Sequence, residues 1–199
     1  MALHPDFPKS PHEILDPEIR WCPADEALRE KGMEKLMPPL VANLRKNVKE
    51  FRDSGYVGAS DTSKNLLDWW FNEPHLLEQA DGSLREFKYY FAQREALETI
   101  IYLYDVIGAK DKNDLFRFDS TGQVSGNMFD ETWRRYVIKM ATGSGKTKVM
   151  ALALAWSYFH KLYDEGILDP ETFTQDSSQA QAKFFRGDSY VLAANYQQL

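Results

Sequence analysis

The residues best suited to chemistry are the glycines, lysine and threonine of the run Met140-Ala141-Thr142-Gly143-Ser144-Gly145-Lys146-Thr147. Glycines let the backbone bring its N–H groups close to an anion. The Lys146 ammonium would reach the terminal phosphates of a nucleotide, and the Thr147 hydroxyl would ligate Mg2+. The general pattern G-x-x-x-x-G-K-[ST] has a glycine where this chain has Met140, so the match is to the tail of the motif. The alternative is a small-residue turn without a ligand, in which the lysine and threonine would have no purpose.

The segments around this run have the order that a phosphate-binding loop requires. The apolar run 136–140 predicts a buried strand, and the pattern becomes helical from Lys148. A helix that begins near Lys146 would add unpaired N–H groups and the positive end of its dipole. Residues 189–194 predict a second strand.

A second candidate segment is the helix predicted to begin at Ala92. Its first turn carries Gln93 and Arg94. A glutamine amide offers both a donor and an acceptor, which is what reading an adenine edge requires. Most glutamines at helix starts are only solvated, so this residue alone is weak evidence.

The remaining segments mostly predict helices and loops. Five prolines in residues 1–24 indicate an extended arm, followed by helices over 25–37 and 39–53. A solvated face explains the basic row of the second helix better than a nucleic-acid contact does. That row is Arg45, Lys46, Lys49 and Arg52. Residues 60–71 predict a short helix with three adjacent aromatics, which cannot all face one core. Residues 81–83 form a turn, and 108–132 form a loop with a hairpin near 115–124.

Composition restricts the class of protein. The 199 residues carry a net charge of −6, so any nucleic-acid contact must be a local patch. The single cysteine, Cys22, excludes an internal disulfide framework and fits a reducing compartment. No run of about 18 apolar residues is present. We therefore expect a cytoplasmic protein with no membrane partner.

Taken together, these residues resemble a known family. The chain resembles the helicase superfamily 2 motor of restriction-type DNA translocases. The residues that carry this resemblance are 91–96, 98–99 and 101–103, followed by 140–147. The likeness is greatest to the Res subunit of type III restriction enzymes, whose first motif commonly has a methionine at the position of Met140. The likeness covers residues 40–165. Residues 66–71 resemble the leader of such motors. Residues 191–195 resemble the next motif, with Ala194 in place of its usual proline.

The resemblance implies a fold, ligands and partners. It implies an α/β fold in which residues 81–199 form an incomplete P-loop (RecA-like) motor domain with parallel strands, after a mainly helical arm over 1–80. ATP and Mg2+ would be the cofactors. Gln93 would bind adenine with Arg94 beside it, while Gly143, Ser144, Gly145, Lys146 and Thr147 would hold the phosphates and the metal. The partners would be double-stranded DNA and a methyltransferase or specificity subunit.

Hydrolysis in such motors also needs an Asp-Glu pair at the end of an apolar strand. Asp130-Glu131 lies in a polar stretch before the loop, and Asp164-Glu165 ends the helix that Lys146 begins, so both pairs are interpreted as surface carboxylates. We therefore expect the N-terminal piece of a larger enzyme, or a truncated product. Two alternatives remain: a non-catalytic interaction protein that binds a partner through residues 60–75, and a small P-loop kinase.

We predict that the purified chain binds ATP weakly and does not hydrolyse it efficiently, because it lacks the acidic group that orients water. Steady-state phosphate release checks this. DNA-stimulated turnover that disappears in Lys146→Ala would contradict the expectation.

Overall fold

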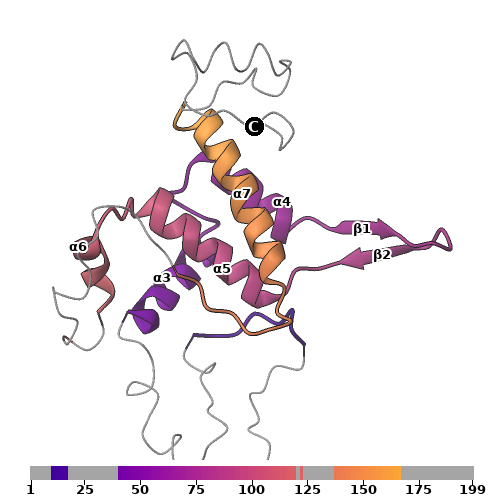
Figure 1. The fold of residues 1–199 in the computed structure, drawn as a ribbon, viewed down its shortest axis with the longest axis horizontal. Coiled ribbons are helices and arrows are strands. Elements are labelled where there is room, and N and C mark those ends of the chain that lie inside the picture. Colours follow the sequence, from indigo (N-terminus) through magenta and orange to yellow (C-terminus); the bar gives the residue numbers. More distant parts are fainter. Residues whose placement is uncertain (1–9, 18–39, 120–121, 123–136, 167–199) are drawn as a thin grey trace, which may run out of the picture. The chain divides into compact units, whose positions relative to one another are not determined.

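The first described helix confirms one sequence prediction. In the computed structural model, which describes residues 10–17, 40–119, 122 and 137–166, helix α3 spans Val41–Asp53 (Figure 1). Val48 and Phe51 of its apolar stripe are buried. Gly55 follows with φ +70°, the left-handed conformation that commonly ends a helix. The predicted helix over 25–37 lies outside the described residues.

The basic row of α3 is not wholly solvated, and the prediction was wrong for Arg52. This residue is only 8% exposed. Its guanidinium meets a buried carboxylate on another helix, Glu98, at 2.9 and 3.0 Å from Nε. Lys49, by contrast, pairs with exposed Asp53 one turn further along the same helix. On this helix face, Arg52 is buried because its acidic partner is buried, whereas Lys49 and its partner both remain partly exposed.

Helix α4 spans Asp61–Phe71 and begins as the sequence predicted. The Ser60 hydroxyl accepts a hydrogen bond from the Ser63 N–H at 3.2 Å, which caps the helix. Trp70 is 5% exposed, whereas its neighbour Trp69 is 56% exposed. Adjacent residues on a helix point in different directions, so the aromatics divide between core and surface as expected.

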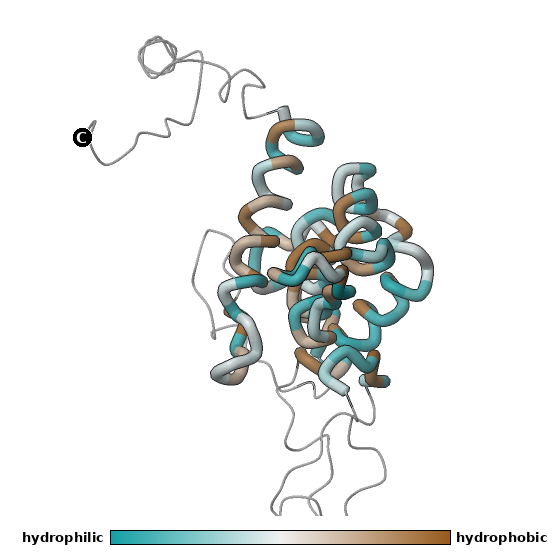
Figure 2. Tube along the Cα trace, turned by 90° about the vertical axis from the view of Figure 1, so that its right-hand side faces the viewer, coloured by the Kyte–Doolittle hydropathy of each residue, from teal (hydrophilic) through white to brown (hydrophobic). Residues whose placement is uncertain are grey.

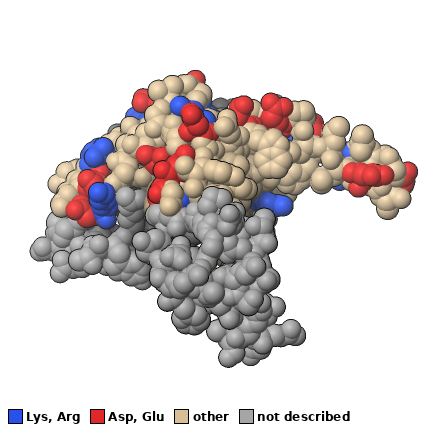
Figure 3. Space-filling view, turned by 90° about the horizontal axis from the view of Figure 1, so that it is seen from above, with Lys and Arg blue, Asp and Glu red and all other residues tan. Residues whose placement is uncertain are grey.

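A two-stranded hairpin follows, with strands that the sequence reading did not predict. β1 (His75–Glu78) pairs antiparallel with β2 (Leu84–Phe87), and the predicted turn at residues 81–83 joins them. The Asp81 carboxylate accepts a hydrogen bond from the Ser83 N–H at 2.9 Å, and Gly82 has φ +79°. The hairpin extends away from the helices (Figure 1), and acidic side chains gather towards its outer end (Figure 3).

Helix α5 (Phe91–Ile101) is the central element against which the others pack. Both α3 and α4 contact it, and Leu97 and Ile101 are fully buried. The helix continues into a π-helical turn, Tyr102–Val106. Figure 2 shows apolar and polar positions interleaved along the helices, the pattern of elements that each bury one face.

The hairpin predicted near 115–124 is wrong where the structure describes it. Residues there form helix α6 (Lys112–Leu115) and a 3-10 turn, Phe116–Phe118. The Asp111 carboxylate accepts a hydrogen bond from the Asn113 N–H at 2.7 Å and so favours a helical start. Residues 120–121 and 123–124 lie outside the described part.

The buried strand predicted over 136–140 is also wrong for its described residues. Residues 137–140 have no regular structure, and Val137 is 87% exposed. A strand needs neighbours that accept and donate its backbone hydrogen bonds. No described residue supplies them, and the two strands seen are antiparallel. The predicted strand over 189–194 lies outside the described residues.

Helix α7 (Lys146–Tyr163) begins at the lysine of the phosphate loop. The chain divides into two compact units, residues 1–151 and 152–199, and α7 runs from the first into the second. In the second unit His160 is 6% exposed and stacks on Trp156 at 5.1 Å between ring centres. Its Nδ1 lies 2.7 Å from an Asp164 oxygen, and its Nε2 lies 3.5 Å from one of Glu165. Asp164 and Glu165 are exposed, as predicted, and their carboxylates also contact this histidine.

The proposed domain boundary at residue 80 stays a prediction. Within the described residues no helix is long and apolar enough to cross a membrane.

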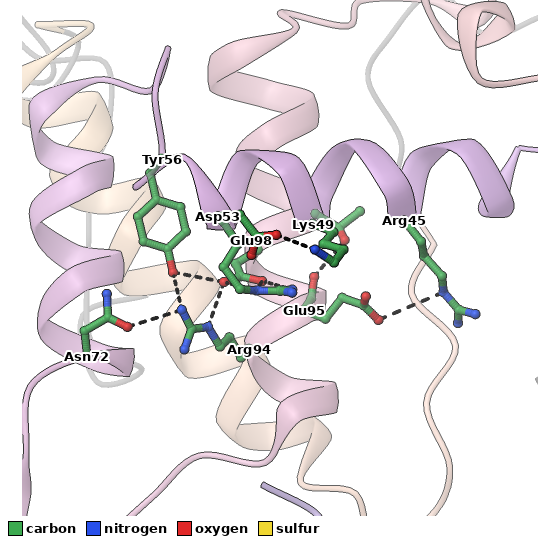
Figure 4. Close-up of polar contacts among 10 residues, drawn as sticks. Arg45, Lys49, Asp53, Tyr56, Asn72, Arg94, Glu95 and Glu98 are labelled. Carbon is green, nitrogen blue, oxygen red and sulfur yellow. Dashed lines mark hydrogen bonds and ion pairs between the residues drawn. The ribbon is translucent and has the colours of Figure 1, made fainter. Parts of the chain in front are cut away.

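The strongest polar interaction in the first unit is a buried cluster around the Glu98 carboxylate. Besides Arg52, it accepts hydrogen bonds from Arg94 Nε at 2.8 Å and from the Tyr56 hydroxyl at 2.9 Å (Figure 4). Burial, reinforced by the adjacent carboxylate, raises the pKa of Tyr56, so its hydroxyl stays protonated and donates. Glu98 has no solvent exposure and satisfies both oxygens through these donors.

We predict that Glu98→Ala lowers the free energy of unfolding by about 3–5 kcal/mol, because two buried guanidinium groups lose their counter-charge. Urea denaturation measures the change. Glu95→Ala on the same helix is the matched control. Its carboxylate lies 4.0 Å from the part-exposed Arg45 guanidinium, and a loss of about 1 kcal/mol or less is expected. Equal losses would contradict the prediction.

Candidate nucleotide-binding site

The phosphate loop has the backbone conformation that its glycines were predicted to allow. Gly143 has φ +80° and Gly145 has φ +77°, values that residues with a side chain rarely adopt. Between them, the Ser144 hydroxyl donates to the Ala141 carbonyl at 2.6 Å and closes the turn. Contacts within the loop itself therefore support its conformation.

The start of α7 leaves donors available beside this loop. The first N–H groups that bond back to Gly145 are those of Lys148 and Val149, at 2.9 and 3.4 Å. Within the described part of the chain, the N–H groups of Gly145, Lys146 and Thr147 donate no hydrogen bond. Such groups, together with the helix dipole, favour an anion.

The Lys146 ammonium folds back over the loop. Its Nζ lies 3.0 Å from the Ala141 carbonyl oxygen and 3.3 Å from that of Met140. These neutral acceptors hold it in an exposed position close to the free N–H groups. A phosphate would replace them, because a charged acceptor makes a stronger bond to an ammonium than a carbonyl does.

Gln93 lies directly against the phosphate loop. Its Oε1 accepts the Tyr90 N–H at 2.9 Å, and its Nε2 donates to the Ser144 carbonyl at 3.2 Å. The side chain is only 6% exposed. A methyl group on Gly145 would lie 2.1 Å from Nε2, so this close approach requires a glycine.

Arg94 points in another direction. Its guanidinium contacts the Glu98 carboxylate, the Tyr56 hydroxyl at 2.9 Å and the Asn72 side-chain oxygen at 3.2 Å (Figure 4). It also lies over the Phe71 ring, 5.3 Å from its centre. The structure therefore brings Gln93, but not Arg94, to the phosphate loop.

A cavity of about 690 Å3 opens beside the loop and has a size suited to a nucleotide. Its walls come from the loop and first turn of α7, the start of α5, the hairpin and His12. The lining residues are His12, Leu77, Gln79, Arg85, Glu86, Phe87, Lys88, Tyr90, Gln93, Gly145, Thr147, Lys148 and Ala151.

The hairpin wall is the part of the site that sequence reasoning missed. In the observed register Leu77 lies opposite Arg85, and both line the cavity together with Phe87. Lys148 Nζ lies 5.6 Å from the centre of the Phe87 ring, which joins the hairpin to the first turn of α7. The Asp81-Gly82 turn between two short apolar segments was the available signal.

Thr147 is the described residue placed to contribute a metal ligand. Thr147 lines the cavity at the start of α7. Among the described residues no group of three or more His, Cys, Asp or Glu could hold a metal ion. A hydroxyl combined with phosphate oxygens and water is a donor set that suits Mg2+, so the residues present fit this ion.

Comparison with known families agrees with this geometry. The family model described as "Type III restriction enzyme, res subunit" matches residues 84–184, just over half of the 199 residues. The chain belongs to this family. The matched segment contains β2, Gln93, the phosphate loop and α7. Comparisons with curated proteins and with solved structures gave no match. Family membership implies a P-loop, helicase-like fold, of which the described residues show the loop and helices but no parallel sheet.

We predict that Gly145→Ala destabilises the protein more than Gly143→Ala does. Both substitutions force a side chain into a left-handed conformation, at a cost of about 1–3 kcal/mol. Only at Gly145 does the new methyl also displace Gln93, since nothing lies within 4 Å of the position at Gly143. Thermal unfolding measures both changes.

A second background isolates the clash. In the Gln93→Ala background, Gly145→Ala should destabilise the protein no more than Gly143→Ala does, because the Gln93 side chain that the new methyl would displace is absent. An unchanged difference between the two glycine variants in that background would refute the assigned contact.

Proposed function

We propose that this chain binds ATP as part of an ATP-dependent DNA helicase or translocase of a restriction-modification or related defence system. Family membership points to a helicase-like DNA motor of a restriction system. The geometry of the loop and of Gln93 supports a binding role for named residues. The single observation that carries the proposal is the contact of the Gln93 amide with Ser144 and Gly145 beside a cavity of nucleotide size.

Each residue of the proposed site has a physical role. The N–H groups of Gly145, Lys146 and Thr147 and the Lys146 ammonium would bind the phosphates. Gly143 and Ser144 shape the turn that presents these groups. Mg2+, held by the Thr147 hydroxyl and the phosphates, would neutralise charge on the transferred phosphoryl group.

Gln93 would bind the adenine edge through the donor and acceptor groups that its two shorter hydrogen bonds leave available. Its amide nitrogen has a second hydrogen, and its oxygen has a second lone pair. Tyr90 uses one lone pair of the oxygen, and Nε2 donates to the Ser144 carbonyl at 3.2 Å, with a longer contact of 3.5 Å to the Gly145 carbonyl that the base would replace. The adenine edge needs one donor and one acceptor, so the amide could keep its present orientation while it binds the base.

Double-stranded DNA and a methyltransferase or specificity subunit are the proposed partners, on the basis of the family alone. The acidic outer end of the hairpin (Figure 3) is unsuited to phosphate contacts, so a DNA surface would lie elsewhere. Residues 189–194 are proposed to join a parallel sheet of the motor fold.

A non-catalytic interaction protein is the second candidate function. Exposed apolar side chains favour it: Trp69 is 56% exposed, Leu76 is 59% exposed and Leu77 is 52% exposed. Such a protein would bind a partner through residues 60–75 and would not bind nucleotide.

We predict that Lys146→Ala weakens ATP binding about tenfold or more, because a charge-assisted hydrogen bond to phosphate contributes about 1.5–3 kcal/mol. Equilibrium dialysis with ATP and Mg2+ measures this. Lys110→Ala is the control, since Lys110 is exposed and does not line the cavity. Identical affinities of the original chain and Lys146→Ala, or no ATP binding by either, would favour the interaction protein.

A further inference from the structure

Arg94, a member of the cluster around Glu98, is the residue that follows Gln93 in helix α5. We infer that Arg52 and Glu98 are positioning residues for Gln93, so that helix α3 governs the preference of the site for adenine. This inference rests on the proposed ATP-binding function. It concerns residues that do not touch the nucleotide cavity, because neither Arg52 nor Glu98 lines it.

The two Gln93 hydrogen bonds tolerate little movement of the side chain. A hydrogen bond between these groups requires about 2.7–3.2 Å between heavy atoms. Gln93 satisfies this at 2.9 Å to Tyr90 and 3.2 Å to Ser144. A helix with its side chains has a radius of about 5–6 Å, so a rotation of α5 by about 20° would move a side-chain tip by about 2 Å. That movement would break the contact with the phosphate loop.

Apolar packing alone restrains such a rotation weakly. Leu97 and Ile101 hold the buried face of α5, but apolar contact is not directional. The ion pair is directional. Arg52 Nε lies 3.0 and 2.9 Å from the two Glu98 oxygens, and its terminal nitrogen also donates to the carboxylate. The planar guanidinium therefore fixes the direction in which Glu98 leaves the helix.

The other partners extend this restraint to the first turn of α5. Glu98 accepts from Arg94 on the preceding turn of the same helix, and Arg94 in turn contacts Tyr56 and Asn72. Arg52 also lies over the Phe91 ring, 5.1 Å from its centre, at the start of α5. Gln93 is thus flanked by Phe91 and Arg94, both of which are held through the cluster.

The charges of the cluster explain why Arg52 is the informative residue to change. Two guanidinium groups share one carboxylate, so removal of Glu98 leaves two buried cations and threatens the fold. Arg52→Lys retains the charge beside Glu98 but removes the planar fork. The ion pair then persists, whereas the direction of Glu98 is no longer fixed.

The test compares the affinities of the 199-residue chain for ATP and GTP, measured by equilibrium dialysis with Mg2+. In Arg52→Lys the ratio of ATP to GTP affinity should fall about five- to tenfold, the effect of losing about one hydrogen bond. Lys146→Ala should weaken ATP binding by the same factor in the Arg52→Lys background as in the original chain, because the phosphate contacts are retained. Circular dichroism verifies that the variant is folded.

Arg45→Lys is the matched control. It makes the same substitution on the same helix, and Arg45 also faces α5, but its Nε lies 4.0 Å from Glu95. Its ratio of ATP to GTP affinity should not change. An equal fall in both variants would overturn the inference.

A double-mutant cycle separates positioning from general loosening of the fold. If Arg52 acts through Gln93, Arg52→Lys should not lower the ratio further in Gln93→Ala. An additive loss would overturn the inference. If neither Gln93→Ala nor Lys146→Ala alters ATP binding, the proposed function itself fails. If both do but Arg52→Lys behaves as Arg45→Lys, only the positioning role fails.

Discussion

The fold of the first unit depends on a carboxylate that has no access to water. Arg52, Arg94 and Tyr56 all donate hydrogen bonds to the Glu98 carboxylate and so replace the water that it lacks. Each donor comes from a different part of the chain: from α3, from the preceding turn of α5 and from the loop that follows α3. The requirement to satisfy one buried acid therefore fixes where these segments meet, in a way that apolar packing alone could not.

The geometry of the proposed nucleotide site depends on this arrangement and on the glycines of the loop. Helix α5 brings Gln93 to the loop, and Gly145 provides the space that lets the two approach. The hairpin adds a wall that carries Arg85 and Phe87. Local chemistry forms the loop itself, because its left-handed glycines and the Ser144 bond need no distant partner. The site thus combines a locally determined loop with a helix that is placed by long-range contacts.

This division explains what the sequence could and could not predict. The helices over 41–53, 61–71 and 91–101, the Ser60 cap and the special conformations of Gly143 and Gly145 follow from local patterns. Their determinants lie within a few residues, so one sequence is sufficient. Burial of Arg52 depends on an acid 46 positions away, which no local pattern reveals. The strand predicted over 136–140 failed for a related reason, since a strand exists only with its neighbours.

The contact between Gln93 and Gly145 has a thermodynamic consequence. One carbonyl, that of Ser144, connects the group proposed to recognise the base with the loop proposed to hold the phosphates. For a nucleotide bound in this way, any adjustment of the amide by the base also acts on the loop. By linkage, the factor by which a bound base strengthens phosphate binding equals the factor by which bound phosphate strengthens base recognition. Adenosine and inorganic phosphate would then each strengthen the binding of the other through the Ser144 carbonyl.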